Sequence, residues 1–462
     1  MKKNYILLLS FFATLSLFLT ACTQPTQSNI DESAIFLPML RVEGNRVLNA
    51  YNEEVLLQGV NAGGLFVTER WMTLIAGPHA IADNIPMHNI FLERFGVEKT
   101  QQIWQHYREN FWTEQDFKNI VEMGMNVIRL PFMHLTVDPY FNQVPALPDE
   151  RFNFTLLEEF VADAARHGLY TILDLHGTYG SHNGQDHSGL TIDVPQGANV
   201  MDYVTFWNPD CPIGTENRRK TTELWVAIAQ HFYGNPNIAG FYLLNEPGEK
   251  GTLTVARHWN YFNELYKAIR AVNDHHIIIF NPSWGGGDVP HPTNNPYGFN
   301  WGTNVIYSFH HYTHYNGATN YELHMENMLW RVDEVMARDF GVPLMMGEFT
   351  VLMGGLEGWK GTLRLFQERG WHWTSWTYKV QMSNPDWGPD TVWGIFNSRL
   401  VQEYGIQEAL VHPQTDSFDD IMRKWARTGT DNEHMFKFAF GCGTTLFDVM
   451  RKVIAEFYEC DC

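Results

Sequence analysis

The chain has 462 residues, of which 44% are hydrophobic and 14% aromatic, and its formal net charge is −20. This length allows a large core, divided among domains of about 150 residues or contained in one barrel of more than about 250 residues. The negative charge argues against a nucleic-acid partner, which needs a basic face, and against an acidic polymer as substrate. The 16 Trp residues favour flat apolar platforms in a binding cleft together with a Trp-rich core.

Residues 1–21 have the pattern of an export signal. Two lysines precede an apolar stretch from Tyr5 to Leu19, which is shorter than a typical transmembrane helix. The segment Leu19–Cys22 resembles a bacterial lipobox, which implies cleavage before Cys22 and lipidation of its sulfur. We expect an exported lipoprotein, at the cell surface or in the periplasm, held to the membrane by this anchor and a polar tether over 22–37. An ordinary signal peptide with an incidental cysteine is the alternative.

Export predicts an oxidising compartment, in which the remaining cysteines could form disulfides. No CxxC motif and no zinc-binding spacing is present. The four cysteines Cys211, Cys442, Cys460 and Cys462 allow three pairings, and the sequence leaves the choice open. A bridge from Cys442 to either of the last two would tie down the C-terminal tail.

After a predicted hairpin over 41–48, apolar strand segments alternate with helical patterns. The predicted strands cover 54–60, 125–130, 169–175, 238–244, 276–280, 304–309, 342–347 and 371–377. The predicted helices cover 114–122, 155–167, 219–232, 253–272, 322–339, 361–368 and 417–426, with one more over 446–457. Such alternation is typical of parallel strands with helical crossovers.

Eight strands of this kind predict an α/β fold, a closed (β/α)8 TIM barrel over residues 38–430. An open doubly wound sheet is the alternative, but the glycine-rich phosphate turn that usually follows its first strand is missing. Residues 431–462 form a C-terminal extension with no assigned role. Two connections are long, 62–113 and 176–218, and their Trp, His and Gly content favours packed walls around a pocket on the catalytic face.

Two of the apolar strand segments end in a glutamate. The first runs into Asn245-Glu246-Pro247, and the second runs into Glu348. Pro247 cannot continue a central strand, because it has no N–H for the hydrogen-bond ladder. A strand-end charge that meets water would explain either glutamate alone. Their recurrence predicts two carboxylates that work together on one rim of the sheet.

Further polar or aromatic side chains stand at or just after the ends of the predicted strands, namely Arg129, Asp174, His176, Asn245, His310, Tyr312 and Trp376. Cleavage of an acetal needs a neutral carboxylic acid to protonate the glycosidic oxygen and an ionised carboxylate to attack the anomeric carbon. Carboxyls about 5–5.5 Å apart suit a retaining mechanism, and about 6.5–9.5 Å suits inversion. Arg129 and Tyr312 could keep Glu348 ionised. Asn245 could donate to the sugar 2-hydroxyl, and Trp376 could lie beneath the sugar ring.

In this order the residues resemble the active-site set of glycoside hydrolase family 5, over about Gly59 to Trp393. The resemblance rests on Arg129, His176, Asn245-Glu246-Pro247, His310-x-Tyr312, Gly347-Glu348-Phe349 and Trp376. It implies a (β/α)8 barrel and a retaining mechanism without a cofactor, with Glu246 as acid/base and Glu348 as nucleophile. We also expect no catalytic metal, because no HExxH motif is present and adjacent histidines on a strand point to opposite faces.

Within the family, the sequence is most similar to the exo-β-1,3-glucanase group and its glucosylceramidase relatives. The similarity lies in Gly59–Trp71 and in Leu173–Gly189. It implies that Glu69 contacts the terminal sugar and that Asp186 is an acid of the pocket. Gln185 stands where fungal members place a Phe that clamps the next sugar, whereas Tyr315 keeps an aromatic ring at the opposing position.

We therefore expect retaining hydrolysis of β-glucosidic bonds in a β-glucan or β-glucoside, with exo-β-1,3-glucanase as the first hypothesis. An endo-β-1,4-glucanase (cellulase) and a glucosylceramide-type β-glucosidase stay open, because the departures from the pattern bear on linkage preference. A surface lipoprotein that binds glycans without cleaving them is the alternative of another class. The two intact glutamate motifs disfavour it.

Overall fold

The computed structural model describes residues 35–138, 151–248, 251–282, 289–302, 304–381, 393–440 and 443–459. The predicted export signal, the lipidation of Cys22 and the pairing of Cys442, Cys460 and Cys462 lie outside the described residues. Cys211 is half-buried and carries a free thiol. Within the described ranges, no helix has both the length and the apolar character that crossing a membrane would need.

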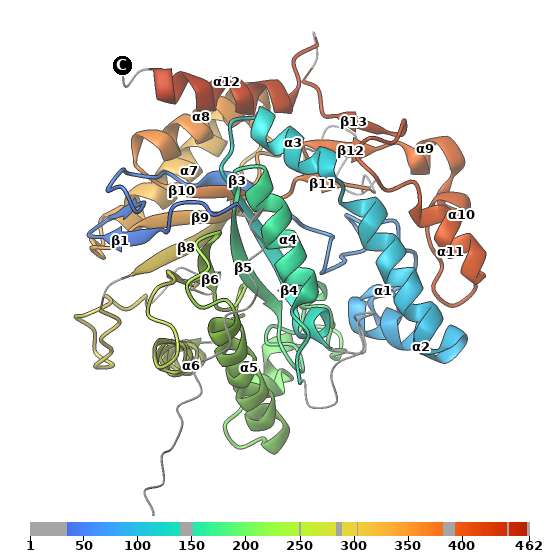
Figure 1. Cartoon of the computed structure of the whole chain (residues 1–462), viewed down its shortest axis with the longest axis horizontal. Helices are drawn as coiled ribbons and strands as arrows, with labels where there is room; N and C mark the ends of the chain where they lie inside the picture. Colours follow the sequence, from blue (N-terminus) through green and yellow to red (C-terminus); the bar gives the residue numbers. More distant parts are fainter. Residues whose placement is uncertain are drawn as a thin grey trace, which may run out of the picture. The chain divides into compact units, whose positions relative to one another are not determined.

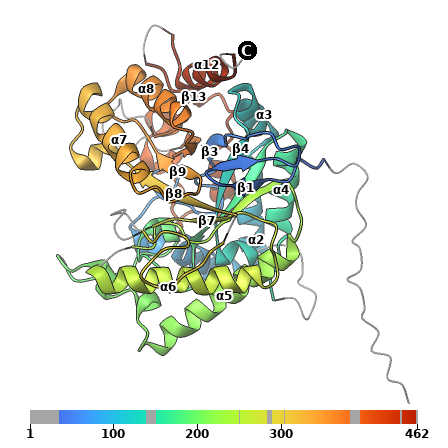
Figure 2. The same cartoon turned by 90° about the vertical axis from the view of Figure 1, so that its left-hand side faces the viewer.

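Eight strands close into a barrel in which every neighbouring pair runs parallel (Figures 1 and 2). They are β3 (Gln58–Asn61), β4 (Val127–Met133), β5 (Tyr170–Gly177), β6 (Ile238–Tyr242), β7 (Ile278–Phe280), β8 (Val305–His311), β9 (Leu344–Phe349) and β10 (His372–Ser375). β10 pairs with both β9 and β3, which closes the ring. The predicted (β/α)8 barrel is confirmed, since each predicted strand segment contains one of these strands or overlaps it.

Helices form the outer layer between successive strands. They are α3 (Glu114–Glu122), α4 (Thr155–Arg166), α5 (Pro212–His231), α6 (Gly251–Arg270), α7 (Tyr321–Met336) and α8 (Gly355–Glu368). α5 buries Leu224, Trp225 and Ile228, one stripe of a helical repeat, while charged residues cover its other face. It begins earlier than predicted, because Pro212 lies in its first turn, where a missing N–H costs nothing.

A short antiparallel hairpin, β1 (Arg41–Glu43) with β2 (Arg46–Leu48), covers the amino end of the barrel strands. Leu40 and Val47 join a buried cluster with Leu57 and residues at the starts of the barrel strands. The Val42 N–H donates to the Asn304 side chain just before β8 (2.8 Å). The hairpin therefore closes the end opposite the strands' carboxyl ends, where barrels of this type place their chemistry.

The sequence predicted packed structure in the long connection after β3, but no helix was identified there from the pattern. The connection holds α1 (His79–Ala82) and α2 (Asn84–Phe111), a long helix broken at Gly96, whose φ is 76°. On each side of the break the buried residues repeat at helical spacing, but the two stripes are out of phase, and the second begins at Thr100. From there it buries Ile103, Trp104, Tyr107 and Phe111.

The connection after β5 contains three 3₁₀ turns, η2 (Asp186–Ser188), η3 (Val200–Asp202) and η4 (Thr205–Trp207). Two more follow strands directly, η1 (His134–Val137) after β4 and η5 (Thr313–Asn316) after β8. Both long connections are therefore packed, one around the long helix α2 and the other from short 3₁₀ turns. They carry side chains to the carboxyl end of the barrel.

The predicted C-terminal extension packs against the rest of the chain, as far as it is described. A small sheet joins β11 (Lys379–Val380), β12 (Phe396–Ser398) and β13 (Met435–Lys437). The described elements within residues 431–462 are β13 and α12 (Leu446–Glu459), whereas α9 (Leu400–Tyr404), α10 (Ile406–Ala409) and α11 (Phe418–Trp425) precede the predicted extension. α11 lies on α2, and α12 lies on α8 (Figure 1). The extension is thus part of the barrel's outer layer.

Candidate active site

A cavity of about 1160 Å³ opens at the carboxyl ends of the barrel strands. Of the predicted site residues, its lining includes Glu69, His176, Asp186, Asn245, Glu246, His310, Tyr312, Tyr315, Glu348 and Trp376. Arg129 does not line the cavity but lies buried beneath it, in contact with Glu348. A second cavity, of about 690 Å³, lies among α2, α3 and α4 and contains none of these residues.

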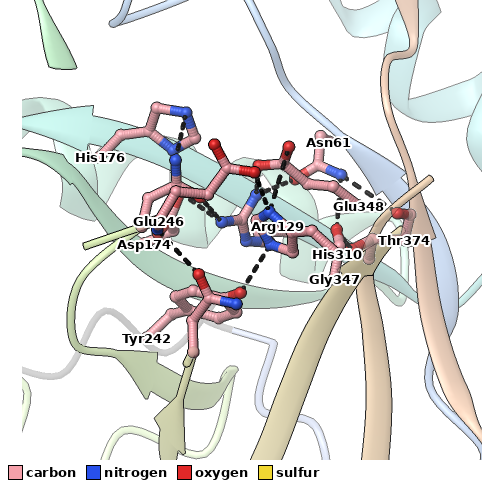
Figure 3. Close-up of polar contacts among 12 residues, drawn as sticks. Asn61, Arg129, Asp174, His176, Tyr242, Glu246, His310, Gly347, Glu348 and Thr374 are labelled. Carbon is pink, nitrogen blue, oxygen red and sulfur yellow. Dashed lines mark hydrogen bonds and ion pairs between the residues drawn. The ribbon is translucent and has the colours of Figure 1, made fainter. Parts of the chain in front are cut away.

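Glu246 and Glu348 meet across the floor of the larger cavity. Glu348 lies in β9, and Glu246 follows β6 by a few residues. One carboxylate oxygen of Glu246 lies within 4.8 Å of one carboxylate oxygen of Glu348. Figure 3 shows both carboxylates next to Arg129. So short a separation suits direct attack by one carboxylate while the other handles the proton.

Both oxygens of the Glu348 carboxylate accept a hydrogen bond. Arg129 Nη1 donates to Oε1 (2.7 Å), and the Tyr312 hydroxyl donates to Oε2 (2.8 Å). Burial, and the negative charge of Glu348 beside it, raise the pKa of Tyr312 well above its ordinary value, so its hydroxyl keeps the proton that it donates. The carboxylate is therefore fixed in one orientation by one partner on β4 and one just after β8.

The prediction that Arg129 lies at the end of its strand is wrong, because β4 continues through Pro131 to Met133. The neighbouring strand β3 ends at Asn61, opposite Arg129, so Pro131 extends past it and needs no ladder partner on that side. Arg129 is fully buried inside the barrel as a result. Its guanidinium reaches the site from below rather than from the rim.

The Arg129 guanidinium is surrounded by acceptors (Figure 3). Nη2 lies 3.1 Å from an oxygen of Asp174 and 2.7 Å from Asn245 Oδ1, and the group lies 4.2 Å above the Tyr242 ring. Burial raises the pKa of Asp174 to about 7, although the positive charge of Arg129 opposes this shift. Arg129 thus links Glu348 on β9 and Asn245, just after β6, to a buried acid on β5.

Glu246 has an unusual backbone conformation, with φ 41°, in the left-handed region that most side chains avoid. Its N–H donates to Asn281 Oδ1 (2.8 Å), and its carbonyl accepts from Asn183 Nδ2 (3.2 Å). A strained backbone of this kind costs about 1–3 kcal/mol and persists only where its surroundings hold it. Here the chain turns sharply after β6, which directs the carboxylate into the cavity.

His310, in β8, connects the Glu246 carboxylate to Tyr242. Its Nδ1 lies 2.7 Å from Glu246 Oε1, and its Nε2 lies 2.8 Å from the Tyr242 oxygen. When Glu246 is ionised, Nδ1–H can donate to it while the Tyr242 hydroxyl donates to Nε2. When Glu246 is protonated, it can donate to Nδ1, and the Tyr242 proton turns to Ser308 Oγ, 3.0 Å away. A neutral His310 can therefore serve both states of the acid.

Asn245 and His176 form one wall of the cavity with Trp376. Asn245 Nδ2 lies 3.2 Å from His176 Nε2, and His176 Nδ1 lies 2.6 Å from an Asp174 oxygen. Burial lowers the pKa of His176 well below its ordinary value, so its ring is neutral. The imidazole stacks on Trp376, with centroids 5.4 Å apart and planes 4° apart, and the Trp376–Thr377 peptide bond is cis.

Another part of the cavity wall comes from the two long connections. Glu69 is buried and accepts a hydrogen bond from Trp71 Nε1 (2.5 Å). Burial and the neighbouring Asp186 raise the pKa of Glu69 well above its ordinary value. Gln185 and Tyr315 both line the cavity, and Tyr315 is 68% exposed. Gln185 and Tyr315, which occupy the positions of the sugar clamp in fungal family members, therefore border the same cavity.

Sequence reasoning did not identify several residues that complete the site, namely Asn61, Asn183, His187, Tyr242, Asn281 and Trp393. Asn61 and Asn281 follow the predicted first and fifth strands, so their strand-end positions were a usable signal. Tyr242 lies within an apolar run and has the pattern of a core residue. Trp393 packs against Trp71, with centroids 5.1 Å apart, although over three hundred residues separate them.

One oxygen or nitrogen atom from each of Glu246, His310 and Glu348 lies within 4.8 Å of the others, a spacing that could hold a metal ion. Arg129 and Tyr312 already donate to the two Glu348 oxygens. A buried guanidinium in contact with a ligand carboxylate would also repel a cation. This donor set therefore fits an acid–nucleophile pair better than a metal centre.

Comparisons with known proteins agree with this geometry. Residues 89–381 match the family described as cellulase (glycosyl hydrolase family 5). A β-xylosidase of Phanerodontia chrysosporium is 28% identical over 258 residues, 54% of this chain and 48% of the relative. A probable glucan 1,3-beta-glucosidase A of Aspergillus fumigatus is 25% identical over 263 residues, 56% of each chain. The chain thus spans about half the length of these curated relatives.

Among solved structures, the rutinosidase from Aspergillus niger superposes with a TM-score of 0.53 at 16% sequence identity. The match covers 70% of this chain and 90% of that chain. At this level of identity the likeness is one of fold.

Proposed function

The chain belongs to glycosyl hydrolase family 5, and from that premise we propose that it hydrolyses β-glucosidic bonds with retention, in the first place as an exo-acting β-1,3-glucanase. One observation carries the proposal. Two carboxylates on β9 and just after β6 bring oxygen atoms within 4.8 Å of each other, which fits the short spacing of retaining enzymes.

In the first step, the Glu348 carboxylate attacks the anomeric carbon while Glu246 protonates the departing glycosidic oxygen. The bond between the anomeric carbon and the leaving oxygen breaks, and an ester forms between the sugar and Glu348. Arg129 and Tyr312 hold Glu348 for the attack. His310, in contact with Glu246, can rearrange its hydrogen bonds as the proton leaves.

In the second step, Glu246 takes a proton from water, and that water attacks the anomeric carbon of the ester. The bond to Glu348 breaks, and the sugar leaves with its original configuration. The proton that Glu246 gave up in the first step returns in the second, so the enzyme needs no cofactor to balance the reaction.

Two observations support a terminal β-glucosyl unit as the substrate. Several relatives have the name glucan 1,3-beta-glucosidase. Glu69 and Asp186, from the connections after β3 and β5, place carboxyl groups on the wall of the cavity, where they could bind sugar hydroxyls. A cellulase-like endo mode, a glucosylceramide substrate and glycan binding without cleavage are the alternatives that the test separates.

The test is a product profile. The chain without residues 1–22 is incubated with laminarin, carboxymethyl-cellulose, a glucosylceramide and an aryl β-xyloside, and products are followed by chromatography. We expect glucose alone from laminarin at the earliest times. A ladder of oligomers from the cellulose derivative would move the assignment to an endoglucanase. A wild type that binds laminarin but never cleaves it would support the non-catalytic alternative, whereas Glu348→Gln should bind it without cleavage.

We further propose that the protein is exported and anchored by lipid at Cys22. The support is the sequence alone, an apolar segment that leads into Leu19-Thr20-Ala21-Cys22. In a bacterial host, metabolic labelling with a fatty acid should place label on the full-length wild type in the membrane fraction. A Cys22→Ser variant should take up none. Equal labelling of both, or of neither, would contradict lipidation at Cys22.

A further inference from the structure

His187 contacts the carboxylate of Glu246 on the oxygen that His310 does not touch. It lies in η2, in the connection after β5, and its Nε2 lies 3.4 Å from Glu246 Oε2. His310 Nδ1 lies 2.7 Å from Oε1. Each oxygen of the acid/base carboxylate therefore faces one imidazole, one from the connection after β5 and one from β8.

We propose that His187 is a positioning residue whose imidazolium holds the Glu246 carboxylate and sets the pH at which this group gives up its proton. The inference rests on the proposed function, in which Glu246 is the acid and base. It assigns a role to a residue that does not belong to the predicted site.

The surroundings of the ring favour its charged form. Asp186 accepts a hydrogen bond from the His187 backbone N–H (3.0 Å), and the same oxygen lies 3.7 Å from Nδ1. Glu69, buried beside Asp186, and Glu246 add two further carboxyl groups. Burial lowers the pKa of His187, but these three acids outweigh it and raise the pKa to about 9. A neutral ring would leave three neighbouring carboxyl groups without this cation.

One contact favours the neutral ring instead. The side-chain nitrogen of Asn183 lies 2.8 Å from His187 Nε2, and this amide also donates to the Glu246 carbonyl. A neutral Nε2 could accept from Asn183, while a protonated ring forms an ion pair with Glu246 Oε2, 3.4 Å from Nε2. We infer that the neighbouring charges determine the protonation state of His187. The attraction of acids on both sides of a buried ring is stronger than one amide contact.

Other titratable groups around the ring do not supply the same charge. The His176 ring, 6.1 Å away, is neutral, because burial lowers its pKa well below the ordinary value. His79, on α1, lies 3.8 Å from the far oxygen of Asp186 and is partly exposed. His310 occupies the other Glu246 oxygen, and Glu348 adds a negative charge. His187 is thus the histidine between Glu246 and the acids of the wall.

The chemical consequence concerns both steps. The nearby Glu348 carboxylate favours a protonated Glu246, as the first step requires. A positive charge at His187 favours the ionised Glu246 that the second step needs as a base. Removing that charge raises the proton affinity of Glu246. Because the alkaline limb of kcat/KM reports the acid of the free enzyme, this limb should then move to higher pH.

The test compares pH profiles of kcat/KM on an aryl β-glucoside for the wild type, His187→Gln and His187→Lys. We expect the alkaline limb of His187→Gln to move up by about one pH unit, and that of His187→Lys, which keeps a positive charge, to stay near the wild type. His276→Gln, at a buried neutral histidine on the amino side of β7, is the matched control and should leave the profile unchanged. An unmoved limb in His187→Gln, or equal shifts in both His187 variants, would overturn the proposal.

A second measurement does not depend on turnover. Because coupling between two sites is reciprocal, Glu246→Gln should lower the pKa of His187, followed by NMR of 15N-labelled histidine and assigned by its absence from either His187 variant. An unchanged His187 titration in Glu246→Gln would contradict the coupling. If the wild type cleaves no glycoside, the proposed function fails, while this titration still decides the role of His187.

Discussion

The orientation of the Glu348 carboxylate is determined by single residues that are far apart in the sequence. Arg129 reaches it from β4, and Tyr312 from just after β8, so each carboxylate oxygen has one donor. A free carboxylate would rotate and would be solvated by water, whereas this one keeps one geometry for attack. Preorganised donors of this kind act where charge changes during reaction, which is where they contribute most to catalysis.

Replacing Tyr312 by Phe tests that contact. The variant loses a hydrogen bond to an ionised group, worth about 1.5–3 kcal/mol, so kcat/KM should fall roughly 10- to 100-fold. Steady-state kinetics on an aryl β-glucoside measure the change. Tyr307→Phe is the matched control on β8, because its buried hydroxyl donates to the Pro290 carbonyl, away from the cavity. Equal losses of activity in both variants would contradict a specific role for Tyr312.

Among single residues, those that could be predicted from the sequence are the ones marked by their neighbours in the chain. Glu246 and Glu348 each follow an apolar run, so their positions on one rim followed from the strand pattern. Tyr242 lies inside such a run, and its hydroxyl gains a role only because β8 brings His310 next to it. His187 likewise depends on a loop that folds back on Glu246. Contacts of this kind come from tertiary structure, which spacing alone does not reveal.

At the scale of elements, the eight strands were predictable because each is a short apolar segment between helical patterns. The boundaries were less so, since β4 runs on through Pro131 and α5 begins at Pro212. α2 was missed because Gly96 interrupts its periodicity. The role of α12 could not be predicted either, because the spacing of an amphipathic helix does not show which surface its apolar face packs against.

The packing of α12 can be tested at Phe447. This side chain is fully buried and lies against Phe396, with centroids 6.1 Å apart. Phe447→Ala should lower the free energy of unfolding by about 3–5 kcal/mol, measured by urea denaturation, without changing kcat of the folded enzyme. Tyr458→Ala, at an exposed ring on the same helix, should change it by no more than about 0.5 kcal/mol. A similar small change for Phe447→Ala would show that α12 adds nothing to the fold.

In the molecule as a whole, the parts that stabilise the barrel lie away from the end that carries the candidate active site. The hairpin closes the amino end of the strands, and the helices, α12 included, cover the outside. The carboxyl end is left for the cavity, where residues from nearly every strand meet. A net charge of −20 and a wall of acids suit a neutral sugar better than an anionic polymer.

In the proposed mechanism, Glu348 forms a covalent bond to the sugar. The most direct measurement is mass spectrometry of the enzyme after incubation with a 2-deoxy-2-fluoro-β-glucoside that has an activated leaving group, followed by peptide mapping. We expect one fluoroglucosyl group per chain, on the peptide that contains Glu348. A chain that turns over β-glucosides yet stays unmodified, or that carries the label on the Glu246 peptide, would contradict it.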